Sequence, residues 1–173
     1  MSKNNDISSL SQREVRIIQE LEFNNQYFFT QEDIKHHATN KQQLYYIIHR
    51  LLQKKRILKL NKNKYYLLPI QAPNNTWYEH EFIIADEMMN SQDYFIGGWA
   101  AANYYNLTDQ IPQQVDIYTN KRNNTTTILN TRYKFKKTTK KRLQEAQNNT
   151  IQGHNIRIEP KEKTKQWMKK RNV

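Results

Sequence analysis

Residues 41–55 carry apolar side chains at the spacing of a single helix face. Leu44, Ile47, Ile48 and Leu51 recur at i, i+3, i+4 and i+7, which is typical of an amphipathic helix that buries one side. At about 100° per residue, the opposite face holds Gln42, Tyr46, His49, Arg50 and Gln53, with Gln43 beside them. Asn40 is well suited to cap this helix. The pattern therefore predicts a helix with a polar, nitrogen-rich outer face.

Shorter patterns before this helix indicate two further helices. Ser11 with Glu14 three residues later forms a capping box, which predicts a first helix that ends at Asn24-Asn25. The aromatic run at 27–29 is expected to form a small strand. Thr30 then stands where a cap would begin a second helix over 31–37.

Two β-type runs, 56–60 and 64–69, follow the third helix and flank the turn Asn61-Lys62-Asn63. This pattern predicts a hairpin with lysines near its tip. Three helices followed by a basic hairpin are typical of a winged helix-turn-helix. We therefore place a winged-helix DNA-binding domain at residues 8–70.

The formal charge of +12 is distributed unevenly along the chain. Residues 1–70 hold 12 basic and 6 acidic residues, 71–130 hold 2 and 7, and 131–173 hold 14 and 3. Phosphates attract such basic blocks and release counterions on binding, so double-stranded DNA is the leading partner. The alternative is a protein-interaction module for an acidic partner. The role of the acidic middle segment stays open.

The expected DNA contacts follow from side-chain chemistry. Gln bonds adenine edges and Arg bonds guanine edges, whereas Lys reaches phosphates. We expect base contacts from Gln42, Gln43, Tyr46, His49 and Arg50. Backbone contacts are expected from Asn40, Lys41, Gln53, Lys59, Lys62, Lys64, Lys136, Lys137, Lys140, Lys141 and Arg142.

The second half is predicted to form a small α+β domain at 76–160, after a linker over 69–75. Helices are expected at 78–89 and around the alanines at 100–102. The β-type runs that follow lie at 115–119, 126–129, 133–135 and 151–158. The fold class is therefore α+β, with two helices followed by an antiparallel or mixed sheet, and a basic tail at 161–173.

Two motifs in this order resemble the AbiEi-type antitoxins of abortive-infection (type IV) toxin–antitoxin systems, over about residues 10–160. The first consists of Tyr66, Leu68 and Pro69 at the end of the hairpin. The second runs through an Ala-rich helix into a strand and comprises Ala100, Ala101, Leu107, Thr108, Gln110, Pro112, Val115, Ile117 and Thr119. Gly97-Gly98-Trp99 stands where the family commonly has Ser, and Asn106 where it has Gly. The family's usual C-terminal Glu-Arg-Thr is absent.

The resemblance implies a transcriptional repressor of its own operon that binds inverted repeats near the promoter. It also implies a functional pairing with a nucleotidyltransferase-like toxin, without a stable complex, in a system that limits phage spread. Family members place the winged helix first and the antitoxin domain second. An inverted-repeat site would take two copies, but the sequence leaves the oligomeric state open.

Composition excludes several kinds of enzyme. The chain has no Cys and three Gly, which excludes thiolate catalysis, Cys-based zinc fingers and Gly-rich phosphate loops. One enzymatic alternative stays open: Asp116 on a strand, with Glu159 and Lys161 after another, could serve a Mg-dependent nuclease. A solvated strand end is the favoured interpretation of these residues, so we expect no enzyme and no cofactor.

His36-His37 and His49 invite a metal interpretation, but no Cys or carboxylate stands at ligand spacing. Adjacent histidines are also expected to point to different sides of a helix, so no metal is expected. No apolar segment is long enough to cross a membrane, and the first residues lack the apolar core of a signal peptide. We therefore expect a cytoplasmic protein.

Overall fold

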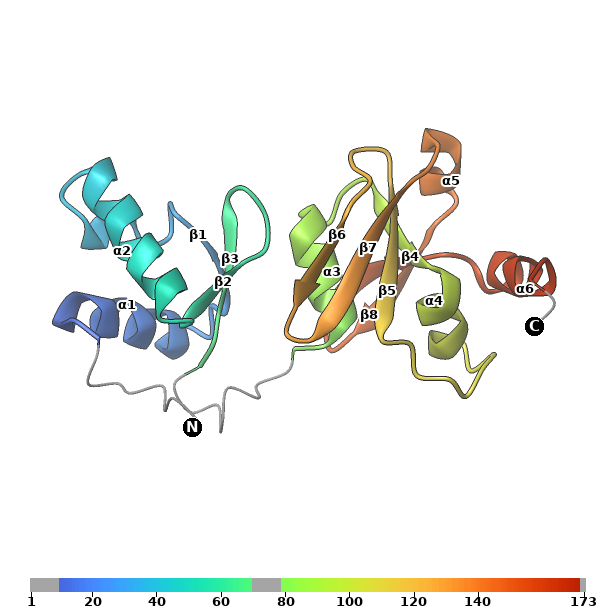
Figure 1. The fold of residues 1–173 in the computed structure, drawn as a ribbon, viewed down its shortest axis with the longest axis horizontal. Helices are drawn as coiled ribbons and strands as arrows, with labels where there is room; N and C mark the ends of the chain where they lie inside the picture. Colours follow the sequence, from blue (N-terminus) through green and yellow to red (C-terminus); the bar gives the residue numbers. More distant parts are fainter. Residues whose placement is uncertain (1–9, 70–78, 172–173) are drawn as a thin grey trace. The chain divides into compact units, whose positions relative to one another are not determined.

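The computed structural model describes residues 10–69 and 79–171. The chain divides into two compact units, Met1–Trp77 and Tyr78–Val173, each combining helices with a sheet (Figure 1). The predicted α+β class is confirmed. The predicted linker lies almost entirely outside the described residues. Among the described residues, no helix has the length and apolarity needed to cross a bilayer.

Within residues 10–69, the N-terminal unit has two α-helices, one 3₁₀ turn and a three-stranded sheet. In chain order these are α1 (Gln12–Phe23), β1 (Phe28–Thr30), η2 (Lys35–His37), α2 (Lys41–Gln53), β2 (Ile57–Lys59) and β3 (Lys64–Leu67). The sheet order is β1-β3-β2, and both strand pairs are antiparallel. The predicted hairpin is therefore β2–β3.

Two of the three helix starts predicted for this unit, at Ser11 and at Asn40, are confirmed. At α1 the Ser11 backbone N donates to Glu14 Oε2 at 2.6 Å, and the Glu14 backbone N donates to Ser11 Oγ at 3.3 Å. At α2 the Gln43 backbone N donates to Asn40 Oδ1 at 2.8 Å. The apolar stripe of α2 is buried and packs with Ile17, Ile18 and Leu21 of α1 in one core.

The predicted second helix over 31–37 is wrong. Only Lys35–His37 is helical, and it forms a single 3₁₀ turn. Ile34 is the one buried side chain of this stretch, so the segment lacks the apolar stripe that stabilises a short helix. Thr30 also donates rather than caps: its backbone N and its Oγ1 both bond Asp33 Oδ2, at 2.6 and 2.7 Å.

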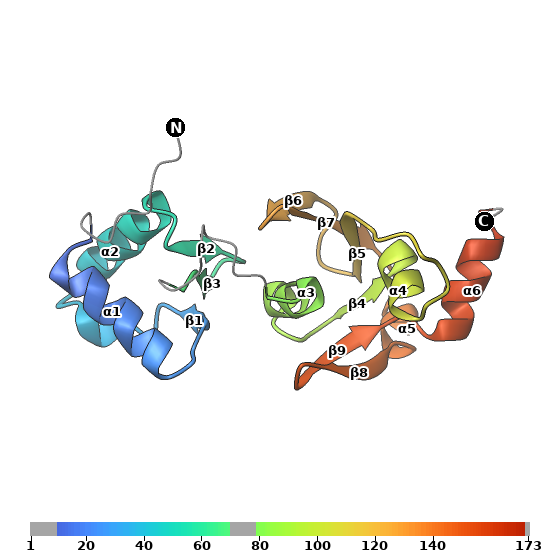
Figure 2. The same cartoon turned by 90° about the horizontal axis from the view of Figure 1, so that it is seen from below.

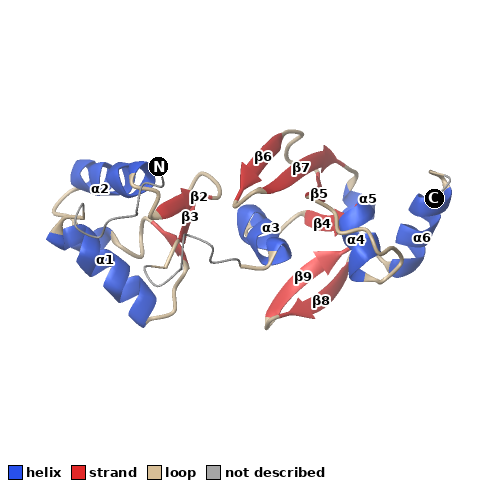
Figure 3. Ribbon diagram, turned by 60° about the horizontal axis from the view of Figure 1, so that its bottom comes forward, coloured by secondary structure: helices blue, strands red, loops and turns tan. Residues whose placement is uncertain are grey.

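The C-terminal unit is built on a six-stranded mixed sheet with the order β6-β7-β5-β4-β9-β8. Its elements are α3 (Glu81–Met89), β4 (Tyr94–Gly97), α4 (Gly98–Tyr104), β5 (Gln114–Thr119), β6 (Thr125–Ile128), β7 (Thr131–Lys137), α5 (Lys140–Gln144), β8 (Gln147–Ile151), β9 (His154–Ile158) and α6 (Lys161–Lys169). The pairs β5–β7 and β4–β9 are parallel. The sheet curves around α3, which is buried on nearly all sides (Figure 3).

The order "two helices, then strands" is wrong, because β4 lies between the helices. All four residues of Tyr94–Gly97 are buried, as expected for a central strand, and the run continues directly into the alanines of α4. The single β-type run predicted at 151–158 instead spans the last residue of β8, the turn at Gln152-Gly153 and β9, and the two strands form an antiparallel hairpin. The helices α5 and α6 were not predicted.

Residues 161–169 form a helix of the second unit where the sequence predicted a basic tail. Helix α6 packs against α4, which lies beside it in Figure 2. The rings of Trp99 and Trp167 meet edge to face at 5.4 Å between centroids. The largest basic block is therefore part of a folded unit.

Candidate nucleic-acid interface

Helix α2 presents a polar, aromatic face to solvent. Its exposed residues are Lys41, Gln42, Tyr45, Tyr46, His49 and Gln53. Tyr45 and Tyr46 are 48% and 59% exposed, which is unusual for such large apolar rings. The Nζ of Lys41 lies 5.7 Å from the Tyr45 ring centre, and the Arg50 guanidinium lies 5.7 Å from the ring of Tyr46. Sequence reasoning missed Tyr45, and the adjacent tyrosine pair was the available signal.

Gln43 and Asn40, which were predicted to contact DNA, form hydrogen bonds within the chain at the start of α2. Gln43 Oε1 accepts from the Thr39 backbone N at 2.8 Å and from Thr39 Oγ1 at 3.1 Å. Asn40 caps the helix with its side-chain oxygen. The carbonyl oxygens of both amides therefore stabilise the helix start, which leaves Gln42, Tyr46 and His49 as the exposed candidates for base contacts.

Arg50, another predicted base contact, forms an ion pair with α1. Its Nε lies 3.2 Å from Glu14 Oε1, at ion-pair distance but without hydrogen-bond geometry. Lys54 Nζ lies 2.7 Å from the other oxygen of the same carboxylate. Burial disfavours ionisation of Glu14, but hydrogen bonds from Lys54 and Ser11 outweigh it and hold the pKa of Glu14 below its ordinary value. Arg50 thus has a structural role beside any DNA contact.

A groove runs along α2 toward the start of α1. It has a volume of about 740 Å³, and its lining includes Tyr46 and Arg50 of α2, Arg13 and Arg16 of α1, and the histidines of η2. Arg13 and Arg16 are exposed, and sequence reasoning missed both of them. They stand three residues apart on the outer face of α1, and that spacing was visible in the sequence.

The β2–β3 hairpin carries the predicted backbone-contacting lysines. Asn61 Oδ1 accepts from the backbone N of Asn63 and of Lys64, both at 3.0 Å, which fixes the turn. Lys59 and Lys62 are exposed, and Lys64 is half-buried. The turn therefore holds Lys62 at an exposed tip.

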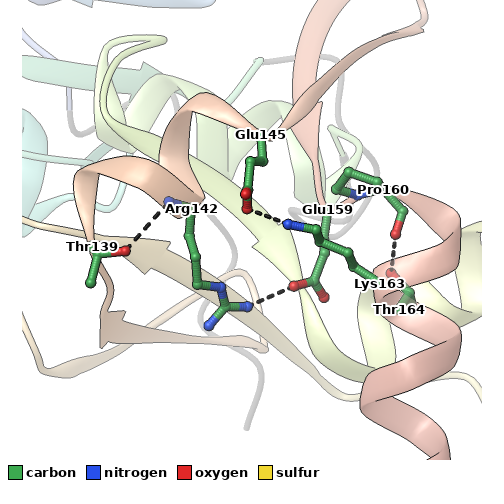
Figure 4. Close-up of polar contacts among 7 residues, drawn as sticks. All are labelled: Thr139, Arg142, Glu145, Glu159, Pro160, Lys163 and Thr164. Carbon is green, nitrogen blue, oxygen red and sulfur yellow. Dashed lines mark hydrogen bonds and ion pairs between the residues drawn. The ribbon is translucent and has the colours of Figure 1, made fainter.

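The five C-terminal residues predicted to contact the DNA backbone fall into two groups. Lys137, Lys140 and Lys141 are exposed. Lys136 Nζ instead lies 2.6 Å from Asp116 Oδ2, and Arg142 Nη2 donates to Glu159 Oε1 at 2.7 Å (Figure 4). Both carboxylates are buried, so Lys136 and Arg142 each compensate a buried charge within the unit, and the Arg142 side chain is also 43% exposed.

The two carboxylates of the nuclease alternative come from β5 and from the residue that follows β9, and these two strands flank β4. Gly97 of β4 is in register with Asp116, and the Glu159 backbone N donates to the carbonyl of Ile96 at 2.9 Å. Each carboxylate, however, has a cation as its partner, while Lys161 is exposed at the start of α6. Within residues 10–69 and 79–171, neither joins a third Asp, Glu or His in a metal-sized cluster.

No known family model matches this chain, and no curated protein shows significant similarity to it. The resemblance to AbiEi-type antitoxins therefore depends on the sequence motifs alone. The stretch with Leu107, Gln110 and Pro112 lies in the loop between α4 and β5. Within it, Asn103 Nδ2 donates to the carbonyl of Gln110 at 3.0 Å, and the Leu107 backbone N donates to the carbonyl of Ala102 at 2.9 Å.

The expectation that His36 and His37 point to different sides is wrong. Both Nε2 atoms contact the carboxylate of Glu20 on α1, at 2.9 and 2.7 Å. A 3₁₀ turn separates adjacent residues by about 120°, so it is the orientation of the two side chains that brings the rings to 4.3 Å between centroids and both Nε2 atoms to Glu20. The carboxylate missing from the local sequence is supplied by α1, 16 residues before His36.

Proposed function

We propose that this protein is a sequence-specific DNA-binding transcriptional regulator whose N-terminal unit acts as a winged helix. The observation that carries the proposal is the exposed face of α2, with Gln42, Tyr46 and His49, in the same compact unit as the lysine-tipped β2–β3 hairpin. A helix fits the major groove of B-DNA, and a basic hairpin beside it can reach the phosphates.

The contacts divide by role in this proposal. Gln42 donates to and accepts from an adenine edge, and the Tyr46 and His49 side chains contact neighbouring base edges. Lys59, Lys62 and Lys41 contact phosphates and set the register of the helix on the duplex. Arg13 and Arg16 add positive charge at the far side of the groove along α2.

We further propose, from the sequence resemblance, that the regulated operon is the protein's own and encodes a nucleotidyltransferase-like toxin. The supporting residues are the ordered motifs that end at Pro69 and Thr119. A reading frame for such a toxin directly beside this gene is the expected observation. If the neighbouring genes include no such toxin, the antitoxin proposal is wrong, and the proposal of DNA binding is then tested by itself.

Promoter preference is expected to depend on the exposed face of α2. We expect the full chain to bind its own promoter DNA more tightly than scrambled DNA. Gln42→Ala and Tyr46→Ala should each reduce that preference by about 1–3 kcal/mol, because each removes a side chain that reads a base edge. Mobility-shift titrations on both DNAs measure it. Equal binding of the wild-type protein to both DNAs would contradict the proposal. Arg50→Ala is a poorer test, because it also disrupts the ion pair with Glu14.

Lys62, at the tip of the β2–β3 hairpin, is expected to contact phosphate and therefore to contribute equally to binding of any DNA sequence. Lys62→Ala should weaken binding to promoter and scrambled DNA alike, and it should reduce the slope of log K against log salt by about one unit. Lys169→Ala, an exposed lysine of α6, is the matched control and should leave the slope unchanged. If both variants had the wild-type slope, the hairpin would not contact phosphate.

A further inference from the structure

We infer that Glu20, His36 and His37 form a binding site for a transition-metal ion, with Zn²⁺ as the best-fitting ion. Among the described residues, these three side chains form a cluster whose ligand atoms all lie within 4.8 Å of one another. The inference concerns a second ligand and does not depend on DNA binding.

The fold brings the three ligands together from two elements. Glu20 lies on α1, and the histidines make up two of the three residues of η2. Glu20 Oε1 lies 2.9 Å from His36 Nε2, and Glu20 Oε2 lies 2.7 Å from His37 Nε2. The cluster is accessible from solvent, because the side chains of Glu20 and His36 are 40% and 54% exposed, whereas that of His37 is 14% exposed.

The donor set matches the preference of zinc. Two imidazoles and one carboxylate are the protein ligands of a known class of Zn²⁺ site, in which water takes the fourth position. With Zn–N and Zn–O bonds of about 2.0–2.2 Å, tetrahedral neighbours lie roughly 3.3 Å apart. The present distances from the Glu20 oxygens to the histidine Nε2 atoms are those of hydrogen bonds. An entering ion would replace these hydrogen bonds and move the ligand atoms apart by about half an ångström. Side-chain rotation at an exposed site permits that change.

A bound ion would fix η2 against α1. The residues that follow η2, Thr39 and Asn40, form the start of α2 through hydrogen bonds to Gln43. The same histidines line the groove along α2. Metal binding would therefore tie together the two helices of this unit at the point where the chain enters α2.

The competing explanation is a plain His–Glu ion pair. Zinc titration calorimetry on the full, untagged chain separates the two. We expect one Zn²⁺ per chain, with the affinity reduced by roughly ten-fold or more in Glu20→Gln, in His36→Ala and in His37→Ala, since each removes a direct ligand. His154→Ala, on β9 of the other unit, is the matched control and should bind like the wild type.

Cobalt provides an independent signature. Co²⁺ added to the wild-type chain should give the visible absorption of a tetrahedral site, and this band should be absent in His37→Ala. Circular dichroism of each variant checks that it is folded. No heat from zinc with the wild-type chain, or zinc binding that persists in a His36→Ala/His37→Ala double variant, would overturn the inference.

Discussion

The variant Gly98→Ala is expected to destabilise the C-terminal unit by about 3–4 kcal/mol, close to the upper end for a single substitution. Gly98 begins α4 with a φ of +64°, in the left-handed region, and a Cβ there would lie 2.6 Å from Asp116 Oδ2. Asp116 cannot easily give way, because it is buried and bonded to Lys136 at 2.6 Å and to Gln114 at 2.7 Å. The strain of a left-handed alanine and the steric clash therefore add.

Gly153 offers a matched control in the same unit. Its φ is +85°, but a Cβ there would meet no atom within 4 Å. Gly153→Ala should therefore cost only the backbone strain, about 1–2 kcal/mol. Urea unfolding measures both variants when it is followed by the tryptophan fluorescence of a Trp77→Phe background, in which Trp99 and Trp167 are the remaining tryptophans. Equal losses of stability in Gly98→Ala and Gly153→Ala would show that the Asp116 carboxylate is free to move away from the new Cβ.

A second large loss is expected for Glu14→Ala, in the N-terminal unit. The carboxylate is 2% exposed, completes the capping box of α1 and pairs with Arg50 of α2 and with Lys54, the residue that follows α2. The variant keeps the Ser11 cap but loses the hydrogen bond from the Ser11 backbone N to the Glu14 carboxylate, which costs about 1 kcal/mol. Removing one member of a fully buried pair costs about 3–5 kcal/mol, but both cations here reach solvent and so can be partly rehydrated. We expect a total of about 2–3 kcal/mol.

Hydrogen exchange of the full chain measures this loss unit by unit, through the protection of amides in α1 and α2. Glu32→Gln is the matched control, because its ion pair with Lys35 at 2.6 Å is exposed on both sides and should contribute little. If the amides of α1 and α2 were as protected from exchange in Glu14→Ala as in Glu32→Gln, the ion pairs of Glu14 would not stabilise the packing of α1 on α2.

Lowering the pH should also remove part of the stability that the Glu14 carboxylate contributes. Since the pKa of Glu14 in the folded chain lies below its ordinary value of 4.5, its contribution is complete above about that pH and is lost as the pH falls through the lowered value. Asp33 and Glu20 also have lowered pKa values and add to the decline. Glu14→Gln should therefore flatten, but not abolish, the fall in stability below pH 4.5.

Local patterns explain what the sequence could predict. The stripe of Leu44, Ile47, Ile48 and Leu51, the capping box and the Asn40 cap each depend on residues within one or two turns, and all are confirmed. Strand β4 was missed because its four apolar residues run without a break into the alanines of α4. A short apolar run does not by itself distinguish strand from helix.

Pairings between distant segments could not be predicted from spacing. Glu14 lies 40 residues from Lys54 in the chain, and Asp116 lies 20 from Lys136. The ion pairs of Arg50, Lys136 and Arg142 with buried carboxylates were likewise not visible in the sequence, and the prediction that these three residues contact DNA stays a prediction. The cluster of Glu20 with His36 and His37 was missed for the same reason.

The docking of α6 on α4 bears on how deletion experiments should be designed. A chain shortened at Pro160, intended to strip away basic charge, would also uncover Trp99 and leave Glu145 without Lys163. A loss of activity in such a deletion would confuse a folding defect with a loss of electrostatic attraction. Charge-neutralising changes at exposed lysines at the two ends of α6, Lys161 and Lys170, keep the tryptophan contact, and they can therefore separate the two effects.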